Sequence, residues 1–485
     1  MMFSVDLTQR LDLIVKYLFI KNRLENLKNE RIDQLYARHI LLRTGAVEGK
    51  KKSVLDFENS FLNLVNSIKK NGYKSRFPIV LSQSNGLPLT GAHRYAACLY
   101  LGEKPEYKYS RHPGKVWDIN WFTEKRFRSV DIDLVYLELF KIENISGLRA
   151  VIIWPALLPE KEKILEGIQR SFKYLYSKTV DLSSRGLKAF VEDVYSLNGR
   201  LNVSQTIRKK AESISSNSDH KSVCIIFFKI DKGNRKLIEI KKKMRVDYSF
   251  RGPEFELIHT TDSGAESLKL AEMCLSQNNL SMLEFRASSY RKNFLKQLQG
   301  LKAFCEKSNF ETSDFCVVGG SLLEVMGLRN SDDVDVVAHS RVRGKMAGYR
   351  GVKLADKLDL VREGYHNKID IKSKNDRIMD NALVDSSAHH FYFNGVKFCN
   401  LNYVLDRKSF QRRKKDIKDV SLINKFLFEN SINFRDQKIG WKIDDWFFVS
   451  KEVSLIKFKN SKPYSAIQYF KRKFKKPKRK LKEFF

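Results

Sequence analysis

The sequence predicts a multidomain protein of mixed α/β and α+β class, and three observations support this expectation. The chain has 485 residues, well above the roughly 150 residues of one ordinary domain. Hydrophobic residues make up 42% of it, which is enough to fill several cores. Short apolar segments of strand length alternate with longer segments whose apolar residues recur at helical spacing. We expect domains at 1–130, 131–288 and 289–455, followed by a basic aromatic tail at 456–485.

The first domain is expected to open with helices and to continue into a strand, a turn and a helix. The elements expected in order are helices at 11–27 and 57–71, a strand at 77–81, a turn at Asn85-Gly86 and a helix at about 93–101. The asparagine–glycine pair marks the turn because both residues tolerate the backbone angles that a tight turn requires.

The second domain is expected to alternate strands and helices. The elements expected in order are a strand at 150–154, a helix at 161–175, a further strand, a helix at 187–195, a strand at 223–228 and a helix at about 265–276. The polar, serine-bearing stretch at 208–222 is expected to be a flexible surface insertion. The third domain is expected to begin with a helix at 290–305 and to run to about residue 455.

The composition indicates a cytoplasmic protein that acts on polyanions. The six cysteines are scattered singly without a CxxC pair, the N-terminus lacks a signal-peptide pattern, and no apolar run approaches the 18 residues of a membrane span. Ninety Lys and Arg against 56 Asp and Glu give a net charge of +34. Only one acid and twelve basic residues follow residue 456, so most of the excess lies in the body of the chain. Nucleic acid, nucleotide phosphates, phosphorylated glycans and anionic membranes all suit such a surface.

The segment 315–337 carries the residues expected to perform chemistry. A short apolar strand ends at Gly319-Gly320-Ser321, where the glycines let backbone N–H groups approach a phosphate and the serine can donate at the start of the next helix. Asp333 and Asp335 are then two residues apart on an apolar strand, so both carboxylates can share one or two Mg²⁺ ions. A third acid is expected on a neighbouring strand, and Asp370 is the choice because it also stands between apolar residues.

This pattern resembles the DNA polymerase β-like nucleotidyltransferase superfamily, in which a hydrophobic residue, Gly-Gly or Gly-Ser, a spacer and a [DE]h[DE] triplet follow one another. The resemblance implies a nucleotidyltransferase fold over the last third of the chain, Mg²⁺ (or Mn²⁺) on Asp333, Asp335 and Asp370, and a nucleoside triphosphate as substrate. The alternative is an edge strand whose acids face outward. The charged segment 412–419 resembles the helix that lays charge near the substrate in such enzymes, or it is simply a solvated helix.

The second domain is similar to nucleoside diphosphate kinase, which implies a ferredoxin-like fold. The resemblance rests on Met244-Arg-Val-Asp-Tyr248, compared with the family's arginine strand, and on Glu256-Leu-Ile-His-Thr-Thr-Asp-Ser263, compared with its histidine motif. It implies that His259 accepts a phosphoryl group, that Arg245 contacts phosphate and that Tyr195 lines the pocket. Trp154 and Glu256 replace a lysine and an asparagine of the family, which argues against ordinary kinase activity. The alternative is that His259 is structural.

The N-terminal domain resembles the ParB/sulfiredoxin fold, on the strand 77–81 and on Gly91-Ala-His-Arg94 at a helix start. Gly91 opens the turn, and His93 and Arg94 are expected to donate charge-assisted hydrogen bonds to a phosphate facing the helix dipole. Sulfiredoxin has a cysteine where Ala92 stands, so its redox reaction is excluded. Kinases exist among relatives of this fold, which makes Glu48 a candidate base. The alternative is a helix start with surface side chains.

These features predict a metal-dependent nucleotidyl- or phospho-transferase. The leading hypothesis is an enzyme of bacterial surface-polysaccharide assembly, for O-antigen or capsule, with a nucleotide and a phosphate-bearing or hydroxyl acceptor as ligands. The alternatives are a nucleotidyltransferase acting on RNA or in a defence or toxin system, and a scaffold whose outer domains only bind. In the tail, Ile467, Phe470 and Phe474 lie at helical spacing among lysines, which predicts attachment to the anionic inner membrane or contact with RNA.

Overall fold

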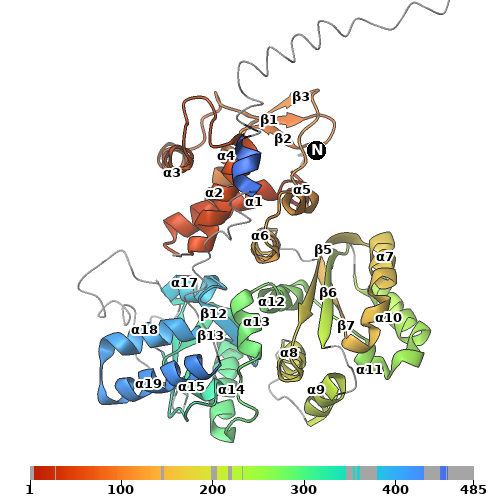
Figure 1. Ribbon diagram of the computed structural model, residues 1–485, viewed down its shortest axis with the longest axis vertical. Coiled ribbons are helices and arrows are strands. Elements are labelled where there is room, and N and C mark those ends of the chain that lie inside the picture. The colour runs from red at the N-terminus through yellow and green to blue at the C-terminus, as the bar shows by residue number, and fades with distance from the viewer. Residues whose placement is uncertain are drawn as a thin grey trace, which may run out of the picture. The chain divides into compact units, whose positions relative to one another are not determined.

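The computed structural model contains two compact units. Unit 1 comprises Met1–Leu24, Asn29–Asp131 and Lys438–Phe485, and unit 2 comprises Glu25–Lys28 and Ile132–Gln437. The mixed α/β multidomain class expected from the sequence is confirmed (Figure 1). The residues described by the structure are 5–27, 29–143, 147–197, 205–216, 221–231, 233–343, 345, 353–355, 358–360, 380–430, 448–454 and 456.

Unit 1 is mainly helical and carries one small sheet. Its helical elements are η1 (Leu7–Gln9), α1 (Leu11–Leu24), α2 (Glu30–Thr44), α3 (Val54–Asn71), α4 (Ala92–Leu101) and α5 (Ile119–Glu124). Its strands are β1 (Ile79–Ser82), β2 (Pro88–Thr90) and β3 (Tyr107–Ser110), in the order β2-β1-β3. Strand β1 is antiparallel to β2 and parallel to β3. Helix α6 (Ser129–Ile142) begins in unit 1 and ends in unit 2.

Residues 448–454, near the C-terminus, belong to unit 1 although more than 300 residues separate them from the rest of it. Lys125 forms an ion pair with Glu452. The Arg126 guanidinium lies 4.6 Å from the centre of the Phe448 ring. The chain therefore leaves unit 1, builds unit 2 and returns.

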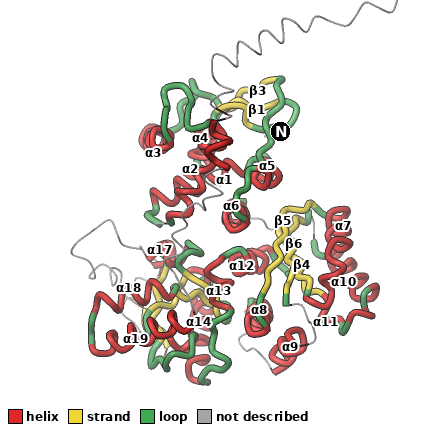
Figure 2. The backbone as a smooth tube through the Cα atoms, in the orientation of Figure 1, coloured by secondary structure: helices red, strands yellow, loops and turns green. Residues whose placement is uncertain are grey.

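The first half of unit 2 is a four-stranded antiparallel sheet. Its strands are β4 (Leu148–Ile153), β5 (Lys173–Asp181), β6 (Ser222–Lys229) and β7 (Ile258–Thr260), in the order β5-β6-β4-β7. The helices are η2 (Pro155–Glu160), α7 (Lys161–Ser171), α8 (Ser184–Ser196), α9 (Gln205–Ser216), α10 (Arg235–Asp247), η3 (Ser249–Arg251), α11 (Glu254–Leu257), α12 (Gly264–Cys274) and α13 (Gln277–Leu283). Ile164 and Ile168 of α7 and Leu237 and Met244 of α10 join one apolar core with the strands, so both helices cover the same face (Figure 2).

The second half of unit 2 is a six-stranded mixed sheet. Its strands are β8 (Phe315–Val318), β9 (Val334–Ala338), β10 (Lys353–Ala355), β11 (Leu358–Leu360), β12 (His390–Phe393) and β13 (Val396–Cys399). The order is β10-β11-β9-β8-β13-β12. Strand β9 runs antiparallel to β8 and parallel to β11, while β13 runs parallel to β8. The helices are α14 (Lys292–Ser308), η4 (Thr312–Asp314), α15 (Ser321–Val325), α16 (Ser340–Arg343), α17 (Asp380–Asp385), α18 (Leu401–Gln411) and α19 (Lys414–Glu429).

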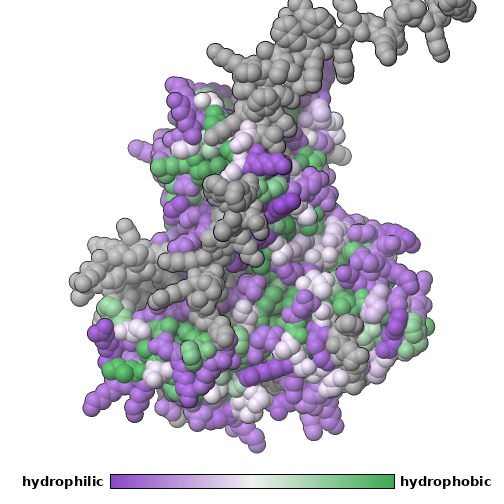
Figure 3. All heavy atoms as spheres, in the orientation of Figure 1, coloured by the Kyte–Doolittle hydropathy of each residue, from purple (hydrophilic) through white to green (hydrophobic). Residues whose placement is uncertain are grey.

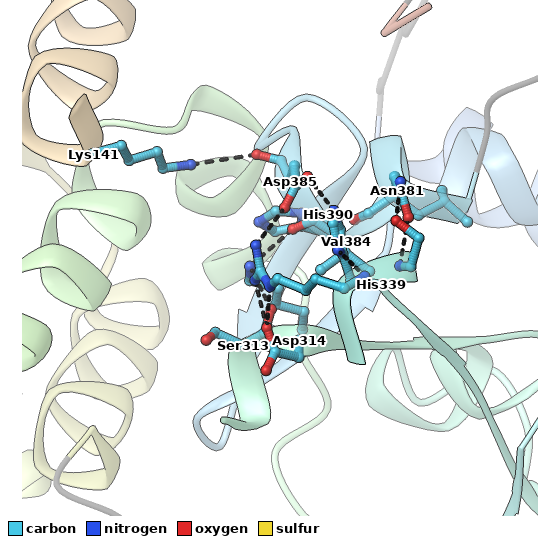
Figure 4. A network of polar contacts seen from close by, with 12 residues as sticks. Lys141, Ser313, Asp314, His339, Asn381, Val384, Asp385 and His390 are labelled. Carbon is cyan, nitrogen blue, oxygen red and sulfur yellow. Dashed lines mark hydrogen bonds and ion pairs between the residues drawn. The ribbon is translucent and has the colours of Figure 1, made fainter. Parts of the chain in front are cut away.

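A polar network joins the two halves of unit 2. Figure 4 shows Lys141, at the end of α6, reaching the carbonyl oxygen of Asp385, and the same ammonium pairs with Glu272 at 2.7 Å. The Asp385 carboxylate lies 2.8 Å from His339 Nε2. Buried Lys397 donates to two backbone carbonyls nearby. Because buried charges must be paired or hydrogen-bonded, this network ties α6, α12, α17 and β13 to one another.

Four sequence-based expectations need correction. The stretch expected to be a flexible insertion is helical through Ser216, where α9 ends, because Ile207, Ala211 and Ile214 recur at helical spacing. Arg245 lies on helix α10 rather than on a strand. The helix expected at 161–175 ends at Ser171, and its last residues begin β5. Asp333 precedes β9 rather than lying within it.

Candidate nucleotide and phosphate sites

The turn after β8 brings a glycine against a carboxylate. Gly319 has φ +80°, in the left-handed region that glycine adopts without steric cost. A Cβ atom at this position would lie 3.1 Å from Oδ2 of Asp335, tighter than most real contacts. Asp335 is half-buried on β9, which pairs with β8 so that Val318 stands opposite it. The strand pairing thus holds the Asp335 carboxylate directly beside the glycine turn.

Asp333 is fixed through its backbone. The hydroxyl groups of Ser321 and Ser331 both donate to its carbonyl oxygen at 2.8 Å. Ser321 is buried, so in this structure its hydroxyl positions the Asp333 backbone rather than facing solvent. The Asp333 side chain is exposed. One aspartate is therefore accessible and the other lies against the turn, two residues away.

The loop before Asp333 is braced by an ion pair from Arg291, the residue that directly precedes α14. Arg291 contacts both carboxylate oxygens of Glu324, at 2.9 and 2.6 Å. The same carboxylate accepts the backbone N–H of Ser331 at 2.7 Å. Glu324 is buried, so these bonds satisfy a charge that water cannot reach. They hold the loop that carries Asp333 in one conformation.

A cationic side chain covers the second glycine of the turn. A Cβ atom at Gly320 would lie 2.8 Å from Nη2 of Arg329. Arg329 makes a two-pronged ion pair with Asp419 of α19, at 2.6 and 2.8 Å. Its hydrogen bonds to Asp419, together with the charges of Asp332 and Asp333, raise the pKa of Arg329. Positive charge is therefore permanent beside the turn.

The acids of α19 belong to the same network. Lys408 Nζ lies 2.6 Å from Asp419 and 3.2 Å from Asp416, and Arg413 pairs with Asp416 at 2.6 Å. Burial opposes ionisation of Asp419, but its hydrogen bonds and ion pairs with Arg329 and Lys408 lower its pKa below the ordinary value. The charged segment 412–419, predicted from the sequence, thus connects to the glycine turn through Arg329.

The third acidic ligand expected from the sequence is Asp370. Asp370 lies outside the described residues. On β11, which runs parallel to β9, Asp359 is the register partner of Asp335. Sequence reasoning passed over Asp359, although it also stands between two leucines. No group of three or more metal-ligating side chains occurs among the residues whose side chains are described, and the side chain of Asp359 is not among them.

The donor chemistry at the turn fits a hard divalent cation. Asp333 and Asp335 offer carboxylate oxygens two residues apart, and Mg²⁺ is commonly held by one or two carboxylates together with substrate phosphates. Gly319 leaves room for the Asp335 carboxylate where a side chain would displace it. These two residues could therefore hold Mg²⁺ or Mn²⁺.

A second cluster surrounds His259 on β7. Its ring lies 4.9 Å from that of Tyr195 on α8, in an edge-to-face arrangement. Lys210 of α9 places its ammonium 4.2 Å from the Tyr195 ring centre. His259 Nε2 is 3.8 Å from Glu266, and this buried nitrogen has no hydrogen-bond partner within the described part of the chain. The structure thus brings together His259 and Tyr195, as expected, and adds Lys210, which the sequence did not reveal.

Burial and nearby positive charges lower the pKa values of two lysines and of His259 in this cluster. Burial and the charges of Arg245 and Lys241 lower the pKa of Lys210 to about 8. Burial and Arg245 also lower the pKa of Lys241, against the opposing charges of Asp262 and Glu266. Burial lowers the pKa of His259, Glu266 opposes the shift, and Lys241 and Lys210 strengthen it. Like charges that depress one another's pKa values are typical of a site that binds an anion.

The residues that follow His259 in the histidine motif are hydrogen-bonded to β4 and α12. The Thr261 hydroxyl bonds to Ser267 at 2.7 Å, and the N–H of Ala150 donates to it at 2.8 Å. Ser263 caps helix α12 by accepting the N–H of Glu266. Trp154, which stands where the resembled kinase family has a lysine, is fully buried. The positive charges around His259 therefore come from α9 and α10 instead.

The predicted N-terminal residues do not form one phosphate-facing group. Gly91 has φ +82° and precedes α4, as expected for a helix start. Arg94 donates to the carbonyl of Phe77, and Glu48 pairs with Arg43 at 3.0 Å. Burial and the charge of Lys16 hold the pKa of His93 well below its ordinary value, so His93 is neutral at pH 7 and is not a charge-assisted donor. Its Nε2 contacts the Tyr36 hydroxyl at 3.1 Å.

On the face drawn in Figure 3, hydrophilic side chains surround small separate apolar patches. Within the described ranges, no helix combines the length and apolar character needed to cross a bilayer.

Comparison with protein-family models, with curated proteins and with solved structures found no match to this chain.

Proposed function

We propose that unit 2 is a metal-dependent nucleotidyltransferase whose reaction takes place at the turn 319–321. One observation carries the proposal: the Asp335 carboxylate lies against Gly319 while Ser321 fixes Asp333 through its carbonyl. A glycine turn at the end of a buried strand, beside two carboxylates, is an arrangement suited to a triphosphate and its metal. A charged ligand of this kind also agrees with the net charge of +34.

In nucleotidyl transfer, the residues at the turn would divide metal binding and phosphate binding among them. Asp333 and Asp335 would hold Mg²⁺, which when bound neutralises phosphate charge and activates an attacking oxygen. Gly319 and Gly320 have no side chains to keep a phosphate from their backbone N–H groups. Arg329 maintains positive charge beside Gly320, where the pyrophosphate leaving group needs it.

The sheet topology supports the same proposal. Strands β8, β9 and β11, in the order β11-β9-β8, place the glycine turn beside Asp335 of β9 and Asp333, which directly precedes that strand. Asp359 on β11, level with Asp335 on the adjacent strand, is a candidate for a third ligand alongside Asp370. We propose a place in surface-polysaccharide assembly, with a phosphate-bearing or hydroxyl acceptor. Transfer to RNA, including in a defence or toxin system, is the alternative.

The test compares three neighbouring acids. Asp333→Asn and Asp335→Asn should each lower nucleotidyl transfer at least about a hundredfold, because the loss of a metal ligand removes several kcal/mol of transition-state stabilisation. Asp332→Asn is the matched control, since Asp332 is an exposed acid in the same loop. Turnover is measured by mass detection of products across nucleotides and acceptors with Mg²⁺. Equal turnover in all three variants and the parent chain would exclude the turn as the reaction site.

A second candidate function is phosphoryl transfer through His259. The strand order β5-β6-β4-β7, with antiparallel neighbours, supports the ferredoxin-like, nucleoside diphosphate kinase-like fold expected from the sequence. A neutral imidazole is a suitable nucleophile near pH 7. A ring nitrogen would attack the terminal phosphorus of a nucleoside triphosphate, forming an N–P bond while the diphosphate leaves. Lys210, Lys241 and Arg245 would balance the phosphate charge.

Labelling distinguishes this function from a structural histidine. Incubation with γ-labelled nucleotide should give an acid-labile, base-stable label that His259→Ala abolishes. His112→Ala, at an exposed histidine of unit 1, is the control that should retain the label. An unlabelled parent protein, tested with several nucleotides, would leave His259 as a structural residue.

A further inference from the structure

A cavity of about 420 Å³ lies between the two halves of unit 2, and its lining contains neither His259 nor the residues of the turn 319–321. It is lined by residues of α8 and α9, of the loop leading to α14, of α14 itself and of the turn between β12 and β13. Its volume falls within the roughly 300–1,000 Å³ that small-molecule sites occupy. The lining combines positive charge, aromatic rings and buried polar atoms without partners.

Positive charge borders the cavity on α8 and α9. Arg185 and Arg208 are exposed, and neither has an ion-pair partner among the described residues. Lys188 lies beside them and pairs with exposed Glu212 at 2.8 Å. Two acids also line the cavity: Asp193 is paired with Arg286 at 2.6 Å, and burial and the charge of Asp193 raise the pKa of Glu192. The lining therefore favours an anionic group.

Two buried polar atoms of the lining residues have neither a hydrogen-bond partner nor an ion-pair partner within the described part of the chain. Arg286 uses its Nη1 in an ion pair with Asp193 at 2.6 Å, but its Nε has no acceptor. Asn394 has no donor for its Oδ1, although it is only 8% exposed. An unsatisfied buried polar atom costs about 1–3 kcal/mol. A ligand with both a donor and an acceptor, such as a base edge or a ribose hydroxyl, would satisfy both atoms.

Aromatic rings form part of the wall. The rings of Tyr290 and Phe393 are 4.7 Å apart, and the Arg286 guanidinium lies 5.4 Å from the Phe393 ring centre. Flat rings stack on aromatic side chains and on guanidinium groups, with about 1–3 kcal/mol per nucleobase. The wall therefore suits a planar heterocycle better than an aliphatic chain.

We propose that this cavity is a second nucleotide-binding site, with phosphates toward Arg185 and Arg208 and the base toward Tyr290. The site is separate from the metal turn. Gly319 follows the end of β8, whereas the turn at Asn394 and Gly395 precedes the start of β13, which runs parallel to β8. The two turns thus lie at opposite ends of the same sheet.

The test is photocrosslinking of the full-length chain with 8-azido-ATP in EDTA, followed by peptide mapping. Labelled peptides should come from 185–208 or 286–299. Arg208→Gln and Tyr290→Ala should each reduce this label about tenfold or more, the loss expected for a charge-assisted contact or a stacked base. Lys209→Gln is the matched control, because Lys209 is the exposed neighbour of Arg208 and does not line the cavity.

Asp335→Asn separates this proposal from the proposed transferase function. It should abolish turnover and leave the cavity label unchanged, since crosslinking in EDTA requires neither metal nor reaction. Competition by ATP but not by inorganic triphosphate would support recognition of the base. Equal competition by triphosphate, or no label on the cavity peptides, would overturn the proposal.

Discussion

At the scale of single residues, Gly319 and Asp335 depend on each other. Because Gly319 adopts a left-handed backbone conformation and has no Cβ atom, the Asp335 carboxylate can lie directly beside it. The sequence predicted the glycines and both aspartates as a group. It did not predict that Ser321 would hold the Asp333 carbonyl, because that bond joins residues twelve positions apart through the packing of α15 on the sheet.

Gly319→Ala should impair transfer more than it impairs folding. Alanine at φ +80° costs about 1–2 kcal/mol of strain, and its Cβ would also push on Asp335. Gly49→Ala is the control, because Gly49 has φ +60° and nothing within 4 Å of the added atom. We expect similar losses of melting temperature in both variants but at least tenfold lower turnover, about 1.4 kcal/mol, in Gly319→Ala alone. Equal turnover would mean that the Asp335 position is not critical.

Because the pKa of Lys210 is lowered to about 8, anion binding by the His259 cluster should depend on pH. Anion binding needs the ammonium form, so affinity for inorganic pyrophosphate should fall as pH rises through about 8. Lys210→Gln should bind more weakly at pH 7 and change less between pH 7 and 9. Calorimetric titration at several pH values measures both effects. An affinity independent of pH in the parent protein would place pyrophosphate elsewhere.

At the scale of elements, apolar spacing predicted most strands and helices, and it failed where two signals competed. The stretch 208–222 is polar and rich in serine, which suggested a loop, yet it is helical through Ser216, with Ala211 and Ile214 buried and Ile207 half-buried at helical spacing. Lys210 and Lys241 reach His259 from two helices, α9 and α10, that are separated from β7 along the chain. Such convergence depends on tertiary packing, which a single sequence does not reveal.

The ion pairs of α19 make a prediction at this scale. Asp419→Ala would leave Arg329 and Lys408 without their shared carboxylate, and it should cost about 2–3 kcal/mol in urea unfolding of unit 2, less than a fully buried pair because Arg329 is partly exposed. Glu166→Ala removes an exposed pair with Arg170 and should cost less than about 0.5 kcal/mol. Comparable small losses in both variants would show that α19 is held by its apolar contacts alone.

At the scale of the whole molecule, the positive charge remains the main guide to partners. The tail at 457–485 lies outside the described residues, but it carries twelve of the ninety basic residues. Each basic residue near an anionic membrane contributes about 1 kcal/mol, so these charges suffice for salt-sensitive attachment.

Deleting 457–485 should release the protein from anionic vesicles at low salt without changing turnover on a soluble acceptor. Co-sedimentation with and without the tail measures this, and neutral vesicles provide the control. If the full-length protein ignores anionic vesicles but binds RNA tightly, the membrane interpretation is wrong and nucleic acid becomes the leading partner.

The return of residues 448–454 to unit 1 has a consequence for synthesis on the ribosome. Glu452 and Phe448 reach Lys125 and Arg126 only after all of unit 2 has been translated. The surface of unit 1 around Lys125 and Arg126 therefore stays uncovered while some 300 later residues emerge from the ribosome. At synthesis rates of about 5–20 residues per second that delay lasts tens of seconds. Chaperone binding to stalled nascent chains should accordingly be strongest before residue 448 emerges.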